Sequence, residues 1–465
     1  MGISMKSFSF FVLGFALVVL WSCRSQKSSD YLAKVGNRYI SVKEFKDAFE
    51  FNPYLNPRFP ADSAKKVLLK TLVAEKMLAQ EAAFSGRAKK RIADLVDEYR
   101  REALIEEFWN EVIMPKVKVS EKELKRAYHK SKVKKIVRYL LFTNASDAQK
   151  AAELLKQGLS FEELARTRGF TKETIPEDTI TFTGRLPNIE DQVFKMKIGQ
   201  ISPPVKEGLY YFILKDVGEQ LDLFASKMDY AQKRASLLKI LHRRKAEEEF
   251  RNYLAQNVSS PPYRVNEPRF KDLVKKLETF VFKQMGPASK DLLPDDLYYS
   301  FDQKNEAILK KSIVSFYDGS TWNVQTLLKR MMLAPYPIRF DNRRTFRESM
   351  LLSLRHVLDD EILVKQAIQH GLENSAYVNE QSKMWSDYLE YKKGLARALH
   401  NKDLSDVKAI YAYLNTIKHK YPVQVNYAIL DTLKLTPTGM AVLKQHFPGR
   451  LAVPVLPLLP DWHWE

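Results

Sequence analysis

Apolar positions spaced three and four residues apart predict helices along much of the chain. The stretch from 61 to 86 has this spacing, and Gly86 is placed to end the helix. Its apolar side chains are Leu68, Leu69, Leu72, Val73, Met77 and Leu78. A second long helix is predicted from about 88 to 113, before Pro115. Ser41 and Ser120 are each followed three residues later by a glutamate, which is the capping-box spacing that begins a helix.

The pattern changes between residues 135 and 217, where short strands alternate with short helices. "IVRYLLF" and "DTITFTG" read as strands, and "GLYYFILKDV" reads as a strand with apolar side chains on both faces. Helices between mostly antiparallel strands predict a small α/β sandwich. A long charged helix is predicted next, from about 223 to 257, and "VSSPPYRVNEP" ends it at a domain boundary.

The second half of the chain repeats the order of the first. "YDGSTWNVQTL" matches "VGNRYISVKEF", a Pro-rich loop follows both, and "VLDDEILVKQAIQHG" matches "LVAEKMLAQEAAFSG". We interpret this as a duplicated helical module; the alternative is chance similarity between amphipathic helices. Near the end, "YPVQVNYAILDTLKL" could form a strand pair. "VPVLPLLPDWHWE" is more typical of a tail lying in a groove than of a sheet strand.

The amino terminus has the pattern of an export signal. Lys6 precedes an apolar run from Phe8 to Trp21, which is short for a membrane span and suits a signal-peptide core. "LWSC" ends this run at Cys23, the only cysteine, and resembles a bacterial lipoprotein box, although Trp21 is bulkier than usual there. The resemblance implies cleavage before Cys23 and lipid attachment to it. Arg24, where retained lipoproteins carry Asp, favours the outer membrane.

Charge and missing motifs narrow the function further. Lys and Arg number 75 against 56 Asp and Glu, a formal charge of +19, which favours an anionic partner or is simply a solvated surface. Export argues against nucleic acid, which leaves a membrane surface or acidic polypeptides. The eight histidines have no ligand spacing, and phosphate loops, zinc-protease helices and nucleophile elbows are absent from the sequence. We therefore expect no metal and no cofactor.

Two motifs between residues 135 and 217 are specific: the helix pair "LLKQGLSFEELA", and the turn "GQISPPV" with the last strand after it. They resemble the helix pair and the Gly-x-Ile-Ser-x-Pro-Val turn of a parvulin, the small peptidyl-prolyl isomerase domain. This resemblance implies a four-stranded, mainly antiparallel sheet surrounded by helices. Together with the lipoprotein signal and flanking helical modules, the chain resembles the SurA and PrsA class of extracytoplasmic foldases. We therefore expect an α+β fold in which mostly helical chaperone modules flank a parvulin-like domain.

The expected domains follow the chain in order. They are a signal peptide at 1–22, a tether at 23–30, a helical SurA-like module at 31–134, a parvulin-like domain at 135–218, a long helix and linker at 219–260, a second helical module at 261–400, and a carboxyl-terminal part at 401–465. The last part holds a helix, the possible strand pair and the Pro-rich tail.

The resemblance also implies a site. Active parvulins have an apolar groove for the proline ring, and Leu186, Ile189 and Phe194 match its residues. Below the groove they hold two histidines and a Cys or Asp; here Tyr139, Phe212 and Glu173 take those positions, and no histidine occurs between 129 and 242. We expect a peptide groove without its polar cluster, in which Tyr139 and Phe212 are core packing.

Three functions remain open. The first is an outer-membrane lipoprotein chaperone, facing the periplasm, that binds unfolded envelope proteins with weak or no isomerase activity. The second is an active prolyl isomerase in which Tyr139 and Glu173 supply the polar groups. The third is a docking subunit of an envelope assembly that uses the Pro-rich tail.

Overall fold

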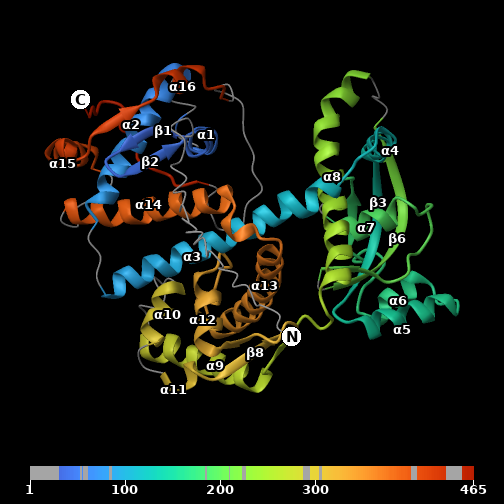
Figure 1. Ribbon diagram of the computed structural model, residues 1–465. Helices are drawn as coiled ribbons and strands as arrows, with labels where there is room; N and C mark the ends of the chain where they lie inside the picture. The colour runs from blue at the N-terminus through green and yellow to red at the C-terminus, as the bar shows by residue number, and fades with distance from the viewer. Residues whose placement is uncertain are drawn as a thin grey trace, which may run out of the picture. The chain divides into compact units, whose positions relative to one another are not determined.

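Helices and short antiparallel sheets alternate along the chain in a computed structural model, which makes the fold α+β (Figure 1). The structure describes residues 31–52, 55, 61–82, 86–183, 186–208, 210–222, 227–285, 294–302, 306–399, 406–435 and 453–464. The described residues up to 100 and from 379 onwards form one compact unit, here unit 1, and the described residues between 101 and 378 form unit 2. No helix within these described ranges is long and apolar enough to cross a membrane.

Unit 1 joins the two ends of the described chain in one sheet. Strands β1 (Tyr31–Val35), β2 (Arg38–Ser41) and β10 (Val423–Val425) lie in the order β10-β1-β2, all antiparallel. The helices are α1 (Val42–Phe51), α2 (Ala61–Gln80), most of α3 (Gly86–Phe108), most of α14 (Ala376–Ala398), α15 (Val407–Ile417) and α16 (Tyr427–Thr432). Figure 1 shows the blue strands β1 and β2, from the start of the described chain, near the red helix α16, which is close to its end.

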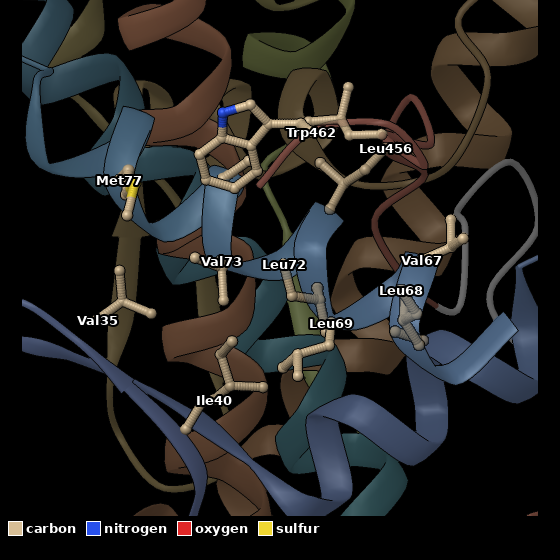
Figure 2. Close-up of a cluster of buried hydrophobic side chains, with 14 of the residues drawn as sticks. Val35, Ile40, Val67, Leu68, Leu69, Leu72, Val73, Met77, Leu456 and Trp462 are labelled. Atoms are coloured by element: carbon tan, nitrogen blue, oxygen red, sulfur yellow. The ribbon is translucent and has the colours of Figure 1, made fainter. Parts of the chain in front are cut away.

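Helix α2 is the centre of unit 1. Residues 71–79 are all buried, because strands, α15 and the carboxyl-terminal segment cover the helix on several sides. Figure 2 shows this core, with Ile40 of β2 and Leu456 and Trp462 of the carboxyl-terminal segment around the α2 side chains. The predicted end at Gly86 differs: α2 ends at Gln80, whose side-chain amide donates to the Lys76 carbonyl at 2.9 Å. Gly86 begins α3 instead.

The α2 core also contains charge. Lys76 is fully buried, and its Nζ lies 2.6 Å from Glu44 Oε1, 2.8 Å from Asp387 Oδ2 and 3.2 Å from Glu75 Oε2. Neither carboxylate oxygen of Glu75 has a hydrogen bond to any residue that the structure describes. Burial raises the pKa of Glu75 to about 8, although the Lys76 charge opposes the shift.

The first part of unit 2 is the small sandwich that the alternating pattern predicts. Its strands are β3 (Val133–Phe142), β4 (Glu177–Ile180), β5 (Val205–Glu207) and β6 (Tyr210–Leu221), in the order β4-β3-β6-β5 and all antiparallel. Helices α4 (Glu121–Ser131), α5 (Ala145–Lys156), α6 (Phe161–Thr167), α7 (Pro187–Val193) and α8 (Lys227–Asn257) surround it. Ser120 and Ser160 begin α4 and α6 with complete capping boxes.

Both faces of this sheet are covered, which explains why the first half of β6, residues 210–214, is apolar on both faces. Leu140 and Ile213 pack against α5 and α6 on one face. On the other face, Val137 and Leu214 pack against α7. Alternate residues of each strand therefore enter two separate cores.

The second part of unit 2 has a sheet in the order β7-β8-β9, formed by β7 (Tyr263–Val265), β8 (Ser312–Phe316) and β9 (Thr321–Asn323). The helices are α9 (Glu267–Thr279), α10 (Pro294–Asp302), α11 (Glu306–Leu309), α12 (Val324–Leu333) and α13 (Arg343–Gln369). As in unit 1, a third strand pairs with the first strand of a hairpin and leads into an Asn-capped helix, after Asn266 here and Asn426 there. Short π and 3₁₀ turns lie at Trp109–Ile113, Met114–Lys116, Phe280–Met285, Leu372–Asn374 and Lys418–Lys420.

Candidate functional site

The "GQISPPV" turn fixes one edge of the candidate site. Gly199 has a φ of +88°, which favours glycine, and its N–H donates to the Asp216 carbonyl at 2.7 Å. Ser202 then binds Leu214 twice, through its N–H at 2.8 Å and through its hydroxyl, which accepts from the Leu214 N–H at 2.9 Å. Two prolines follow and cannot donate, so the pairing breaks until β5 begins at Val205. The turn thus docks along β6 and leads from α7 into β5.

Tyr139 and Phe212 meet on the α7 side of the sheet. Their ring centroids are 5.9 Å apart, and the planes are tilted by 58°. Both rings are half-buried against one apolar cluster: Val137, Ile180, Ile189, Val193, Met196, Val205 and Leu214. The Tyr139 hydroxyl has no hydrogen-bond partner among the residues that the structure describes. This pair therefore offers an apolar aromatic surface that contains neither an imidazole nor a carboxyl group.

Glu173 is not part of this cluster. Its side chain is exposed, and hydrogen bonds from its own backbone N–H and from Thr171 lower its pKa. The turn that carries it leads to Pro176, whose carbonyl accepts from the Tyr139 N–H at 3.0 Å. The backbone of this segment reaches Tyr139, but the Glu173 carboxylate is bound within its own turn.

The three residues matched to the groove have different surroundings. Ile189 is buried in the same cluster as Tyr139 and Phe212, whereas Leu186 is 39% exposed. Phe194 packs in another cluster with Phe182, at a ring distance of 6.2 Å, together with side chains of α4 and α8. The structure therefore brings Ile189 to the aromatic pair and places Phe194 against the flanking helices.

An exposed apolar surface continues from the aromatic pair. Leu141 lies directly opposite Phe212 in the ladder and is 38% exposed, and Tyr210, on the same face of β6, is 45% exposed. Partly exposed apolar side chains at the end of a sheet suit an extended apolar peptide. The described residues contain no group of three His, Cys, Asp or Glu side chains that could hold a metal ion.

A buried ion pair that the sequence analysis did not identify fixes α7. Glu190 is 1% exposed, and its Oε2 lies 2.5 Å from Arg244 Nη2 of α8. The Arg244 guanidinium also binds Asp191 at 2.8 Å and lies 4.8 Å from the Phe182 ring centroid. The other Glu190 oxygen accepts from the Leu186 N–H at 3.4 Å. Helix α8 thus fixes the start of α7, where Leu186 lies. In the sequence, the only sign of this ion pair was the opposite charge of "IEDQ" and "HRRK".

Glu207 of β5 holds the other side of α7. Its carboxylate accepts from the backbone N–H groups of Asn188 at 2.9 Å and Ile189 at 3.2 Å. A carboxylate at these free N–H groups stabilises a helix start. The candidate surface is therefore positioned by rigid elements on two sides.

Comparison with known proteins agrees with this geometry. Residues 119–217 match the family model of the PPIC-type PPIase domain. The foldase protein PrsA of Caldanaerobacter subterraneus is 28% identical over 256 residues, which cover 45% of this chain and 81% of that protein. Foldase protein PrsA 2 of Bacillus anthracis is 24% identical over 222 residues, which cover 44% of this chain and 75% of that protein.

Solved structures of PrsA and SurA-like proteins are also similar to this chain. The peptidylprolyl isomerase PrsA of Bacillus anthracis has 18% identity and a TM-score of 0.21, with 40% of this chain and 97% of that chain covered. A SurA-like chaperone of Campylobacter jejuni has 16% identity and a TM-score of 0.20, with 49% and 96% covered. Cys23 lies outside the described residues. Residues 119–217 therefore match the PPIC-type PPIase domain, and somewhat less than half of this chain is similar to the PrsA foldases.

Proposed function

We propose that this protein is an envelope lipoprotein chaperone that binds unfolded exported polypeptides, and that its parvulin domain has weak or no isomerase activity. The observation that carries the proposal is the Tyr139–Phe212 pair. These two aromatic residues stand where the family resemblance implies histidines, and they continue an apolar surface rather than a polar cluster.

The chemistry of prolyl isomerisation explains why aromatic residues at these two positions argue against catalysis. Twisting the amide costs about 20 kcal/mol, because resonance is lost. A catalyst must bind the twisted amide better than the planar one, through a dry groove and through hydrogen bonds that favour the twisted form. Leu141, Ile189 and the aromatic pair supply apolar contact, and the Tyr139 hydroxyl is the only side-chain hydrogen-bond donor among these four residues. Binding of an extended chain needs only the apolar groove and no stabilisation of a twisted amide.

The envelope location is part of the same proposal. A signal peptide at 1–22 and a lipid on Cys23 would hold the protein at the outer membrane, facing the periplasm. A formal charge of +19 then favours encounter with acidic unfolded chains over distances of about a Debye length.

Two assays on one preparation test the proposal. The chain without residues 1–22 should suppress aggregation of an acidic, denatured outer-membrane protein, and suppression should weaken as salt rises. The same protein should isomerise a proline tetrapeptide no faster than buffer. L141D should reduce suppression, because it places a charge on the apolar surface next to Phe212. L154D is the matched control, since Leu154 is 45% exposed on α5, away from this surface.

The outcomes separate the alternatives. No suppression at any salt concentration would remove the chaperone function. Isomerisation well above the buffer rate would show that the domain is an active enzyme. Stoichiometric co-purification with one envelope protein, without suppression, would instead favour a docking subunit.

A further inference from the structure

The carboxyl-terminal segment, residues 453–464, has a strict three-residue period. Pro454, Pro457 and Pro460 recur at every third position. The residue before the first proline and every third residue after it are buried: Val453, Leu456, Leu459 and Trp462 are 2%, 5%, 3% and 2% exposed. A period of three belongs to the polyproline II helix, whose side chains at i, i+3 and i+6 share one face. The segment is therefore patterned as a ligand of a groove.

The segment lies along unit 1. Leu456, Leu459 and Trp462 enter the core that contains α2, and Val453 packs with Met384 and Trp385 of α14. Figure 2 shows Leu456 and Trp462 next to the α2 side chains, including Leu72 and Val73. One face of the Pro-rich segment thus fills an apolar surface formed by helices far away in the sequence.

Side chains of unit 1 hold the backbone of the segment at three consecutive residues. The Thr71 hydroxyl accepts from the Leu459 N–H at 3.1 Å, and Lys70 Nζ donates to the Pro460 carbonyl at 2.8 Å. The Tyr411 hydroxyl accepts from the Asp461 N–H at 3.3 Å. Within the described part of the chain, residues 453–464 make no backbone–backbone hydrogen bond to another element. A site that contacts only the backbone and every third side chain can bind many different peptides, provided that each has apolar residues and proline in this spacing.

Two details show that the fit is not that of an ordinary core segment. The indole Nε1 of Trp462 is buried without a hydrogen-bond partner among the described residues, which costs about 1–3 kcal/mol. Next to the end of the segment, an open cavity of about 430 Å³ is lined by Lys418 and His419 together with aromatic and apolar side chains, among them Tyr427 and Trp464. A different peptide could avoid the first cost and extend into the cavity.

We propose that unit 1 contains a groove for extended, proline-containing apolar segments of other chains, and that residues 453–464 are its intramolecular occupant. This rests on the proposed function, because unfolded clients would supply such segments. Polyproline II is a major conformer of unfolded chains, so these segments bind at a low entropic cost. A client has to displace the tail, so the tail regulates access to the groove.

A synthetic peptide of the tail tests the groove directly. Fluorescently labelled VPVLPLLPDWHWE is titrated into the full chain and into a chain that ends at residue 452. A tethered competitor acts at an effective concentration of about 1 mM, so we expect the truncated chain to bind on the order of 10- to 100-fold more tightly. A peptide with the same composition but without the three-residue spacing should bind at least about tenfold more weakly.

Variants of α2 locate the site. In the truncated chain, the double substitution K70A and T71V removes two contacts to the peptide backbone and should weaken binding about tenfold or more. K66A is the control, because Lys66 is exposed on the same helix. If the truncated chain does not fold, W462A in the full chain removes one anchor and should still increase peptide binding severalfold.

Equal binding by the full and the shortened or W462A chains, or equal binding of the rearranged peptide, would overturn the proposal. The aggregation assay on the same preparations separates it from the chaperone function. A full chain that suppresses aggregation while no variant gains affinity for the peptide leaves the chaperone function and removes the tail-filled groove. Tighter peptide binding by the variants, without suppression of aggregation by the full chain, would keep the tail-filled groove and remove the chaperone function.

Discussion

At the scale of single residues, the hydroxyl of Tyr139 separates a catalytic from a packing role. It has no hydrogen-bond partner among the described residues, and the ring packs against Phe212. We expect Y139F to change the free energy of unfolding by less than about 0.5 kcal/mol. Y139A should lower it by about 2 kcal/mol, because half-buried ring contacts are lost. Urea denaturation measures both effects.

The Y139F variant also tests the isomerase alternative. If Tyr139 is core packing, peptide isomerisation in the presence of Y139F equals that of the unmodified protein. An isomerase rate above buffer that Y139F abolishes, with stability unchanged, would instead assign the hydroxyl to the reaction.

Glu75 gives a prediction on pH. Its pKa is raised to about 8 in the folded protein, whereas in an unfolded chain the group titrates near 4.3. The stability that neutral Glu75 provides is therefore fully present below about pH 4.3 and is lost as pH rises through about 8. Gln at this position stays neutral. The unfolding free energy of E75Q relative to wild type should thus increase by about 2 kcal/mol or more between pH 5 and pH 9.

Comparison at two pH values removes any constant cost of placing an amide in this core. Chemical denaturation at pH 5 and pH 9 gives the difference, and E153Q is the control because Glu153 is exposed on α5. A gap that does not widen toward pH 9 would show that Glu75 is ionised in the folded protein at neutral pH.

At the scale of elements, the sequence pattern predicted helix starts, buried helix faces and strands, because each of these depends on residues close together in the chain. Ser120 and the start of α4, and the apolar row of α2, follow from capping and from a period near 3.6. The four strands around β3 and β6 follow from alternation and from the parvulin resemblance. Each of these features depends on neighbours a few residues away, so the sequence contains the signal.

Contacts between distant segments could not be predicted in this way. Phe194 was matched to the groove, yet in the structure it packs with Phe182 beside α4 and α8, which are outside the predicted domain. Arg244 reaches Glu190 across 54 positions. The apolar, Pro-rich composition of the tail predicted that it lies in a groove, but nothing local indicated that Thr71 and Tyr411 would form it.

The close approach of α14 to α2 within unit 1 depends on Gly394. A Cβ at this position would lie 2.0 Å from the carbonyl oxygen of Leu78, a backbone atom in the middle of the core. Alanine is favoured over glycine in a helix by about 1 kcal/mol, but the clash is larger. We expect G394A to lower the unfolding free energy by about 2–3 kcal/mol in thermal or urea denaturation.

K393A on the same helix is the matched control, since Lys393 is exposed and its substitution should change stability by less than about 0.5 kcal/mol. A stabilised G394A protein would mean that the two helices are further apart than the structure places them.

At the scale of the whole molecule, the chain carries two surfaces suited to extended apolar peptides. One lies on the parvulin domain in unit 2, around Leu141 and the aromatic pair, and the other is the tail-filled groove of unit 1. A holding chaperone gains affinity from two weak sites on one chain, because the second contact becomes intramolecular. This arrangement makes a catalytic parvulin centre unnecessary for client binding.

The proposed lipid anchor at the envelope can be tested through the single cysteine. Cys23 is the only thiol in 465 residues. If lipid is attached to it after cleavage, the mature protein reacts with no maleimide even when denatured, and its mass corresponds to residues 23–465 plus the lipid. C23S should leave the membrane fraction or keep the mass of the uncleaved chain, whereas S25A should behave like the wild type. One reactive thiol in every mature chain would exclude the lipid anchor.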